Sequence, residues 1–365
     1  RSAPGKAGQQ RSRKWPVSRK RCWPSPISRF NRPAKGGIHI KLRVWAEFIT
    51  PEELCKPAVL SLLARYRVQP CLAVPYGRLG AGYARYLYRY GEAGLEPALW
   101  PTLPDSLGYW PHEGNAPEFS DYVREIFQWA RNEKVEVPWL AVDLETPYYQ
   151  WQDINRAHGA KKVSLTLRHY WNNRNRLRFA EAAKTYSALQ QFLREQGCRT
   201  LVPVLPLLEL DLLKGGVKLQ DYLETPVTPV PWDVISVMQY NSMFIGYSRG
   251  LIKPADARWH LYMLCLNARR VLGERASISL GTTSTGKLGN EPYYASPAEM
   301  LPDVEAALAA GITDIAVFCL EGILKAPQPE AWFEMICSAS PVVPRRSRKM
   351  DLARAAARLG YFLLP

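Results

Sequence analysis

Two acidic residues stand two positions apart at the end of an apolar run, Trp139-Leu140-Ala141-Val142-Asp143-Leu144-Glu145-Thr146-Pro147. Side chains at positions i and i+2 of a strand point to the same side, so Asp143 and Glu145 are expected to share one environment. A carboxylate beside a second carboxylate has a raised pKa, which keeps a proton donor available near neutral pH. The pair therefore predicts general acid catalysis. The alternatives are a solvated strand end and pairing with a loop arginine such as Arg168.

The elements that must position this pair follow a regular alternation of strand-like and helix-like segments. The strand-like segments are Ile38–Ile49, Val68–Pro75, Leu95–Leu103, Val137–Leu144, Thr200–Leu208, Trp232–Tyr240, Ala276–Leu280 and Ile312–Leu320. Continuous apolar strands that are each followed by a helix are typical of a parallel sheet covered by helices. Eight such units in about 300 residues predict an α/β fold, a single closed (β/α)8 TIM barrel. The first strand leads into Glu47 without a glycine-rich phosphate turn, which disfavours nucleotide binding.

The net charge of +15 is concentrated at the two ends of the 365-residue chain. Residues 1–36 contain eleven Lys and Arg and no acid, and residues 341–365 contain six basic residues against Asp351. We therefore expect a disordered basic segment over 1–36, which could lie upstream of the true start, a barrel domain over 37–340 and a basic C-terminal tail over 341–365. The barrel itself is nearly neutral, so no specific nucleic-acid partner is predicted.

Other function classes lack a sequence signal. The seven Cys include no C-x-x-C pair, and the five His include no H-x-H or H-E-x-x-H spacing, so neither a metal site nor any cofactor is predicted. No uninterrupted apolar run is long enough to span a membrane. Without a visible signal peptide, the localisation defaults to the cytoplasm. The oligomeric state stays open.

Polar and aromatic residues follow the predicted strands at the end where a barrel carries its active site. Because few Lys or Arg stand among them, they indicate a neutral, polyhydroxylated ligand, and Trp and Tyr rings suit stacking on sugars. A carbohydrate is therefore the predicted partner. The candidate binding residues are Glu47, Trp100, Tyr109, Trp110, Glu113, Asn115, Tyr148, Gln239, Asn241 and Glu321.

Two short segments carry a family resemblance. The ending Asp143-x-Glu145 with Pro147 resembles the end of the fourth-strand D-x-x-D-x-D-x-E motif of family 18 glycoside hydrolases, the chitinase-like barrels. Met238-Gln239-Tyr240-Asn241 resembles that family's M-x-Y-D on the sixth strand. The sequence departs from the family at Pro138, Ala141 and Asn241, where the family has Asp. The bare D-x-E on the fourth strand also resembles family 25 lysozymes.

The family 18 resemblance implies a glycosidase that cleaves a β-linked N-acetylhexosamine chain with retention, the substrate's own acetamide attacking the anomeric carbon. It implies that Glu145 protonates the leaving oxygen, that Asp143 orients the acetamide and stabilises the positive charge, and that Tyr240 donates a hydrogen bond to the acetamide oxygen. The missing aspartates leave a second class open, a barrel that binds a glycan without turning it over. A third is a lyase or isomerase using a divalent metal on Glu47, Asp143, Glu145 and Glu321.

Overall fold

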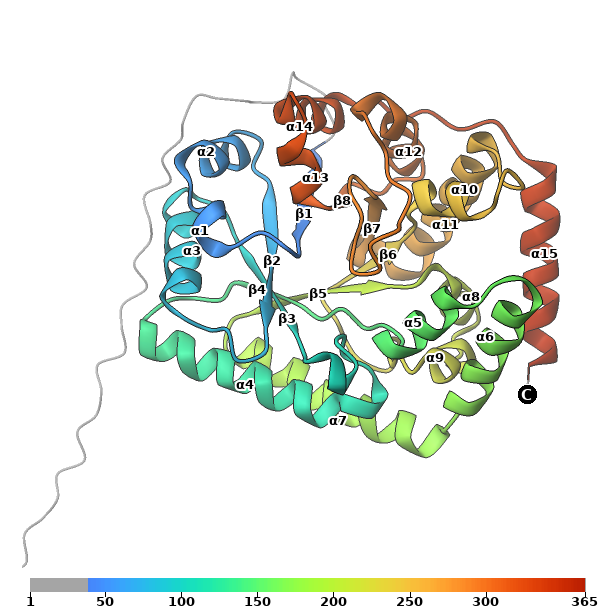
Figure 1. Ribbon diagram of the computed structural model, residues 1–365, viewed down its shortest axis with the longest axis horizontal. Helices are drawn as coiled ribbons and strands as arrows, with labels where there is room; N and C mark the ends of the chain where they lie inside the picture. Colours follow the sequence, from blue (N-terminus) through green and yellow to red (C-terminus); the bar gives the residue numbers. More distant parts are fainter. Residues whose placement is uncertain (1–38, 365) are drawn as a thin grey trace, which may run out of the picture. The chain divides into compact units, whose positions relative to one another are not determined.

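A closed barrel of eight parallel strands, arranged in chain order, forms the centre of the computed structural model, which describes residues 39–364 (Figure 1). This confirms the predicted TIM barrel. The barrel closes through a parallel pairing of the first and last strands, with Trp45 opposite Phe318. The strands are β1 (Lys41–Ala46), β2 (Gln69–Pro75), β3 (Ala98–Thr102), β4 (Trp139–Ala141), β5 (Arg199–Val204), β6 (Val234–Met238), β7 (Ala276–Gly281) and β8 (Asp314–Phe318).

Helices cover the outside of the barrel (Figure 1). Those in the first half are α1 (Pro51–Leu54), α2 (Pro57–Arg65), α3 (Ala81–Glu92), α4 (Ala116–Glu133), α5 (Tyr148–Arg156), α6 (Gly159–Asn173) and α7 (Arg176–Glu195). Those in the second half are α8 (Glu209–Lys214), α9 (Lys218–Leu223), α10 (Asn241–Tyr247), α11 (Pro254–Leu272), α12 (Pro297–Ala309), α13 (Leu320–Lys325), α14 (Pro329–Ser338) and α15 (Arg348–Leu363). Within residues 39–364, no helix has the length and apolar content that a membrane span requires.

The first strand-to-helix connection illustrates how the sequence sets these boundaries. The Thr50 hydroxyl accepts a 3.2 Å hydrogen bond from the Glu53 N–H, while the Glu53 carboxylate accepts a 3.1 Å bond from the Thr50 N–H. This reciprocal capping box satisfies two amide donors that the helix itself leaves free. Pro51 follows at the first helical position, where its missing N–H costs nothing. The helix therefore begins where the sequence predicts.

Large aromatic side chains fill the barrel interior. Trp45 and Trp100 pack edge to face with their ring centroids 5.1 Å apart, and Trp139 is fully buried in the same cluster. Trp100 is only 3% exposed. The sequence proposed it as a stacking platform for sugars, but in the structure it is a core residue, because its position in the middle of β3 directs the ring inward. The interior is thus packed below the strand ends.

Residues 341–364 differ from the expected basic tail, because they carry α15, which packs on the barrel domain. Tyr361 donates a 2.8 Å hydrogen bond to Asp211, and Trp259 of α11 donates one of 2.8 Å to Asp351. Arg354 forms a buried ion pair with Glu209. Glu209 and Asp211, at the start of α8, therefore anchor this helix. The predicted segment 1–36 lies outside the described residues.

Candidate active site

Acidic side chains from two different strands meet at the carboxyl end of the barrel, here termed the mouth. Asp143 and Glu145 follow β4, and Glu47 follows β1. The charges of Glu145 and Glu47 both act on Asp143, and the charge of Glu47 acts on Glu145. The structure therefore brings together three of the acids that the sequence proposed, at the place where TIM barrels carry their active sites.

Asp143 and Glu145 are close enough for the charge of Glu145 to raise the pKa of Asp143. β4 ends at Ala141, so the two acids lie in the segment just after the strand and not within it. Its first residue, Val142, still donates a 2.9 Å main-chain bond to Leu201 of β5, which holds the start of this segment to the barrel. The two acids are thus neighbours, but their positions do not depend on strand geometry alone.

The pair holds a proton at neutral pH. Burial, followed by the charge of Glu47, raises the pKa of Glu145 to about 8. Burial and then the Glu145 charge raise the pKa of Asp143 well above its usual value. Asp143 is 4% exposed and Glu145 is half-buried, and the raised pKa values belong to the pair of carboxyl groups and not to one residue alone. The raised pKa of Glu145 has the direction expected from the sequence.

Glu47 completes the acidic group. Burial raises its pKa to about 7, and the nearby Glu321 charge adds to the shift. The Tyr109 hydroxyl donates a 2.8 Å hydrogen bond to Glu47, which acts in the opposite direction and favours the ionised form. Tyr109 has a φ of 65°, a left-handed conformation that is uncommon for a bulky residue. The loop after β3 therefore places this hydroxyl at the acids at some conformational cost.

Tyr240 lies beside the same acids, after the end of β6. The charges of Asp143, Glu145 and Glu47 add to burial in raising its pKa well above 10, so the phenol stays protonated. Its ring packs at 5.9 Å from that of Phe318. A protonated hydroxyl among carboxyl groups can donate a hydrogen bond to an oxygen of a bound molecule. This is the chemistry that the sequence assigned to Tyr240.

Glu321 has a mainly structural position. One of its carboxylate oxygens accepts hydrogen bonds of 2.6 and 3.0 Å from the main-chain N–H groups of Phe48 and Ile49. These contacts tie the residue after β8 to the turn after β1. The second carboxylate oxygen is buried and has no hydrogen-bond partner among the described residues. Glu321 therefore adds negative charge next to Glu47 while it holds the connection in place.

Tyr109, Trp110 and Tyr148 form an aromatic cluster beside the acids. The ring centroids of Tyr109 and Trp110 are 5.2 Å apart, and those of Trp110 and Tyr148 are 5.6 Å apart, both edge to face. Trp110 and Tyr148 are each 8% exposed. The sequence proposed these three rings, with Trp100, as stacking candidates, and in the structure they contact one another more than they contact solvent.

A lysine that sequence reasoning missed covers this cluster. The Lys287 ammonium lies 4.1 Å from the ring centroid of Tyr109 and 5.1 Å from that of Tyr148, both cation–π distances. It also forms a 3.2 Å ion pair with Asp105, and the Tyr148 hydroxyl donates a 3.3 Å bond to the Lys287 carbonyl. The aromatic cluster thus has one basic neighbour that the strand-end residues did not indicate. In the sequence, the length of the segment 282–296 between β7 and α12 could have indicated this lysine, because long barrel loops often carry function.

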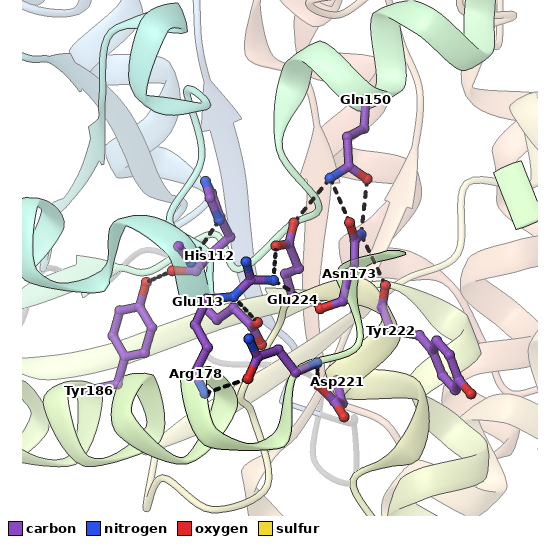
Figure 2. A network of polar contacts seen from close by, with 11 residues as sticks. His112, Glu113, Gln150, Asn173, Arg178, Tyr186, Asp221, Tyr222 and Glu224 are labelled. Atoms are coloured by element: carbon purple, nitrogen blue, oxygen red, sulfur yellow. Dashed lines mark hydrogen bonds and ion pairs between the residues drawn. The ribbon is translucent and has the colours of Figure 1, made fainter. Parts of the chain in front are cut away.

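Glu113 and Asn115 do not face the acids and instead hold the loop after β3 together. Arg178 of α7 pairs with Glu113 and donates a 2.6 Å bond to Glu224 (Figure 2). The Asn115 amide donates to the carbonyls of Leu107 and Trp110 at 2.7 and 2.9 Å. These side chains are buried, and their partners are protein groups.

The polar network around Arg178 continues through two amides (Figure 2). Gln150 and Asn173 exchange two 3.0 Å hydrogen bonds, and Gln150 donates a third, of 3.1 Å, to Glu224. The network thereby joins the segments that follow β3, β4 and β5 from outside the mouth. These contacts hold the segments relative to one another, although one Glu113 oxygen has no hydrogen-bond partner among the described residues.

Gln239 and Asn241 also have protein partners. Gln239 donates a 2.9 Å hydrogen bond to Asn241, which in turn donates one of 2.9 Å to Asp303 of α12. Tyr294 donates to the other oxygen of Asp303 at 2.6 Å. The carboxamide at the position of the family 18 aspartate is thus directed toward α12 and stabilises the start of α10.

Within residues 39–364, no three or more His, Cys, Asp or Glu side chains are grouped in a way that could hold a metal ion. Glu47 accepts a hydrogen bond from Tyr109, and Glu321 accepts one from the main-chain amide of Phe48. The metal-assisted alternative on Glu47, Asp143, Glu145 and Glu321 therefore has no ligand set to support it in the described part of the chain.

Comparison with known proteins shows the fold of this chain and leaves its family open. No family model matches the sequence, and no curated protein matches it. The barrel is similar to the PgaB (BpsB) glycoside hydrolase domain from Bordetella bronchiseptica, with 10% identity, 81% of this chain and 99% of that chain covered, and a TM-score of 0.50. At such an identity, the likeness shows a common TIM-barrel fold.

Two further solved structures illustrate the range of similar barrels. The spore cortex-lytic enzyme SleL from Bacillus megaterium has 9% identity over 86% of this chain and 77% of its own, with a TM-score of 0.47. A xylose isomerase domain protein from Planctomyces limnophilus has 10% identity over 88% of this chain and 96% of its own, with a TM-score of 0.43.

Proposed function

We propose that this chain is a glycoside hydrolase that cleaves a β-linked N-acetylhexosamine glycan at the mouth of the barrel. The observation that carries the proposal is the proton-sharing pair Asp143 and Glu145, next to the hydroxyl of Tyr240. A buried carboxyl pair that retains one proton near pH 7 supplies a general acid and an anionic group in the same place. Glycoside cleavage needs both of these.

In the proposed reaction, Glu145 delivers the proton to the leaving glycosidic oxygen. The two carboxyl groups share this proton, which lies on Glu145 when the substrate is bound. Asp143 then becomes the carboxylate that orients the substrate acetamide and stabilises the developing positive charge. Tyr240 donates its hydrogen bond to the acetamide oxygen, whose attack on the anomeric carbon displaces the leaving group.

The surroundings of the pair support this division of roles. Glu47 raises the pKa of Glu145 across the mouth, which makes Glu145 a proton carrier at neutral pH. Asn241 is bonded to Asp303, so it takes no part in this scheme. Acetamide orientation therefore rests on Asp143 and Tyr240 alone. Lys287 covers the Tyr109 and Tyr148 rings, and a sugar that stacks on them must displace its ammonium.

The proposal is tested by incubating the full chain with an oligomer of β-linked N-acetylglucosamine and, as a matched control, an oligomer of β-linked glucose. We expect cleavage of the first only, with the β anomer detected first by proton NMR. Equal cleavage of both oligomers would show that the substrate acetamide takes no part in the mechanism. Binding of the N-acetylated oligomer without cleavage would select the non-catalytic glycan-binding barrel, and the absence of binding would overturn the proposal.

A further inference from the structure

The C-terminal helix α15 presents an apolar face that no other described element covers. Met350, Arg354 and Tyr361 are buried against the barrel domain and attach the helix along one side. Figure 1 shows α15 along the edge of the barrel domain, beyond α11. Its attachment thus uses one stripe of the helix and leaves most of the circumference in solvent.

The exposed side carries large apolar residues at helical spacing. Leu352, Leu359 and Leu363 are 64–77% exposed, and their separations of seven and four residues place them on one face. Phe362 is 60% exposed beside them. An apolar stripe of this kind on a soluble surface marks an interaction site, because exposing large apolar side chains to water is unfavourable.

The charges around this stripe are positive. Arg345, Arg348 and Arg358 are exposed and have no carboxylate partner among the described residues. The acid of this helix, Asp351, is already bonded to Trp259 and Arg346. At the other end, the exposed Lys214 lies 4.8 Å from the Phe362 ring. An apolar stripe flanked by basic side chains is complementary to an anionic, water-facing apolar layer.

These observations separate the possible occupants of the α15 face. A second copy would place the same basic side chains opposite one another, and residues 1–36, with eleven basic residues and no acid, would be repelled in the same way. The stripe is also convex, so it needs no matching groove. We infer that α15 lies on the surface of an anionic lipid bilayer, inserting its leucines and Phe362 between the headgroups while the arginines contact lipid phosphates and carboxylates.

The test is co-sedimentation of the full chain with vesicles of phosphatidylcholine containing about 30% phosphatidylserine, at about 0.15 M ionic strength. Pure phosphatidylcholine vesicles are the lipid control. The triple variant Leu352→Ser/Leu359→Ser/Leu363→Ser should lower the partition coefficient on the order of a hundredfold. The variant Arg345→Gln/Arg348→Gln/Arg358→Gln should lower it by roughly fivefold for each charge removed. Leu177→Ser, which changes an 80% exposed leucine on α7, should have no effect.

Because the substituted side chains are exposed, the melting temperatures of these variants should equal that of the parent, which separates loss of binding from unfolding. The basic residues of segment 1–36 are the same in every variant, so equal binding by the parent and the leucine variant would overturn the assignment to α15. Absence of binding to the anionic vesicles would overturn it too. A concentration-dependent dimer that the leucine variant abolishes would identify a second copy as the occupant instead.

Discussion

The hydroxyl of Tyr109 donates a 2.8 Å hydrogen bond to Glu47 and thereby connects the loop after β3 to the end of β1. Tyr109→Phe removes this bond and leaves the ring in place. We expect a loss of about 1.5–3 kcal/mol in the free energy of unfolding, the range for a hydrogen bond to a charged group. Chemical denaturation measures it. Tyr149→Phe, at an exposed tyrosine, should stay within about 0.5 kcal/mol of the parent, and an equal loss in both variants would contradict the assigned contact.

The buried acids predict that stability falls as the pH rises. The pKa of Glu47 is raised to about 7 and that of Glu145 to about 8, above their ordinary value of 4.5. At pH values between the ordinary pKa of 4.5 and these raised pKa values, the folded chain binds more protons than the unfolded chain. The free energy of unfolding therefore decreases with increasing pH. Melting temperatures from pH 5 to pH 9 should show this decline. Glu47→Gln should flatten it, and a steeper decline would reverse the assigned direction.

Docking of α15 depends on a buried ion pair. Arg354→Gln leaves Glu209 buried without its cation and should lower the free energy of unfolding by about 3–5 kcal/mol. Arg358→Gln changes an exposed arginine four residues later on the same helix and should have little effect. Denaturant titrations of the two variants give this comparison directly. Equal stability of both would mean that the helix is held by other contacts.

Trp110 is expected to contribute to stability as well as to the site. It is 8% exposed between Tyr109 and Tyr148, so Trp110→Ala should cost about 3 kcal/mol or more. Trp171→Ala, at a tryptophan that is 61% exposed, is the matched control and should cost much less. Calorimetry of the two variants checks the difference. A negligible cost at Trp110 would instead favour a ring that is free to bind ligand.

The barrel could be predicted from the sequence because its eight apolar runs and the helices between them repeat a local pattern. The meeting of Glu47, Asp143, Glu145 and Tyr240 followed from that topology, since parallel strands direct their carboxyl ends to the same side. The direction in which a loop side chain points does not follow from the hydrophobic periodicity of the sequence. Glu113 therefore could not be distinguished from a ligand-binding acid until its pairing with Arg178 was seen.

Two other features were not predictable from local patterns. The attachment of α15 uses Arg354 and Tyr361, and a segment rich in arginine gives no apolar signal for docking. Lys287 reaches Tyr109 from a loop more than 170 positions later in the chain, so only the tertiary fold shows their contact. Both of these features depend on charged side chains that contact buried or aromatic partners.

The central claim, that Glu145 transfers the proton, is tested most directly by the turnover number of Glu145→Gln on the N-acetylglucosamine oligomer. Glu136→Gln, at an exposed glutamate just before β4, is the matched control because it lies at the opposite end of the same strand. The account predicts a fall of about 10²–10⁴-fold for Glu145→Gln with binding of the oligomer retained, and an unchanged rate for Glu136→Gln. A parent enzyme that cleaves the oligomer and a Glu145→Gln variant that keeps its full rate would contradict it.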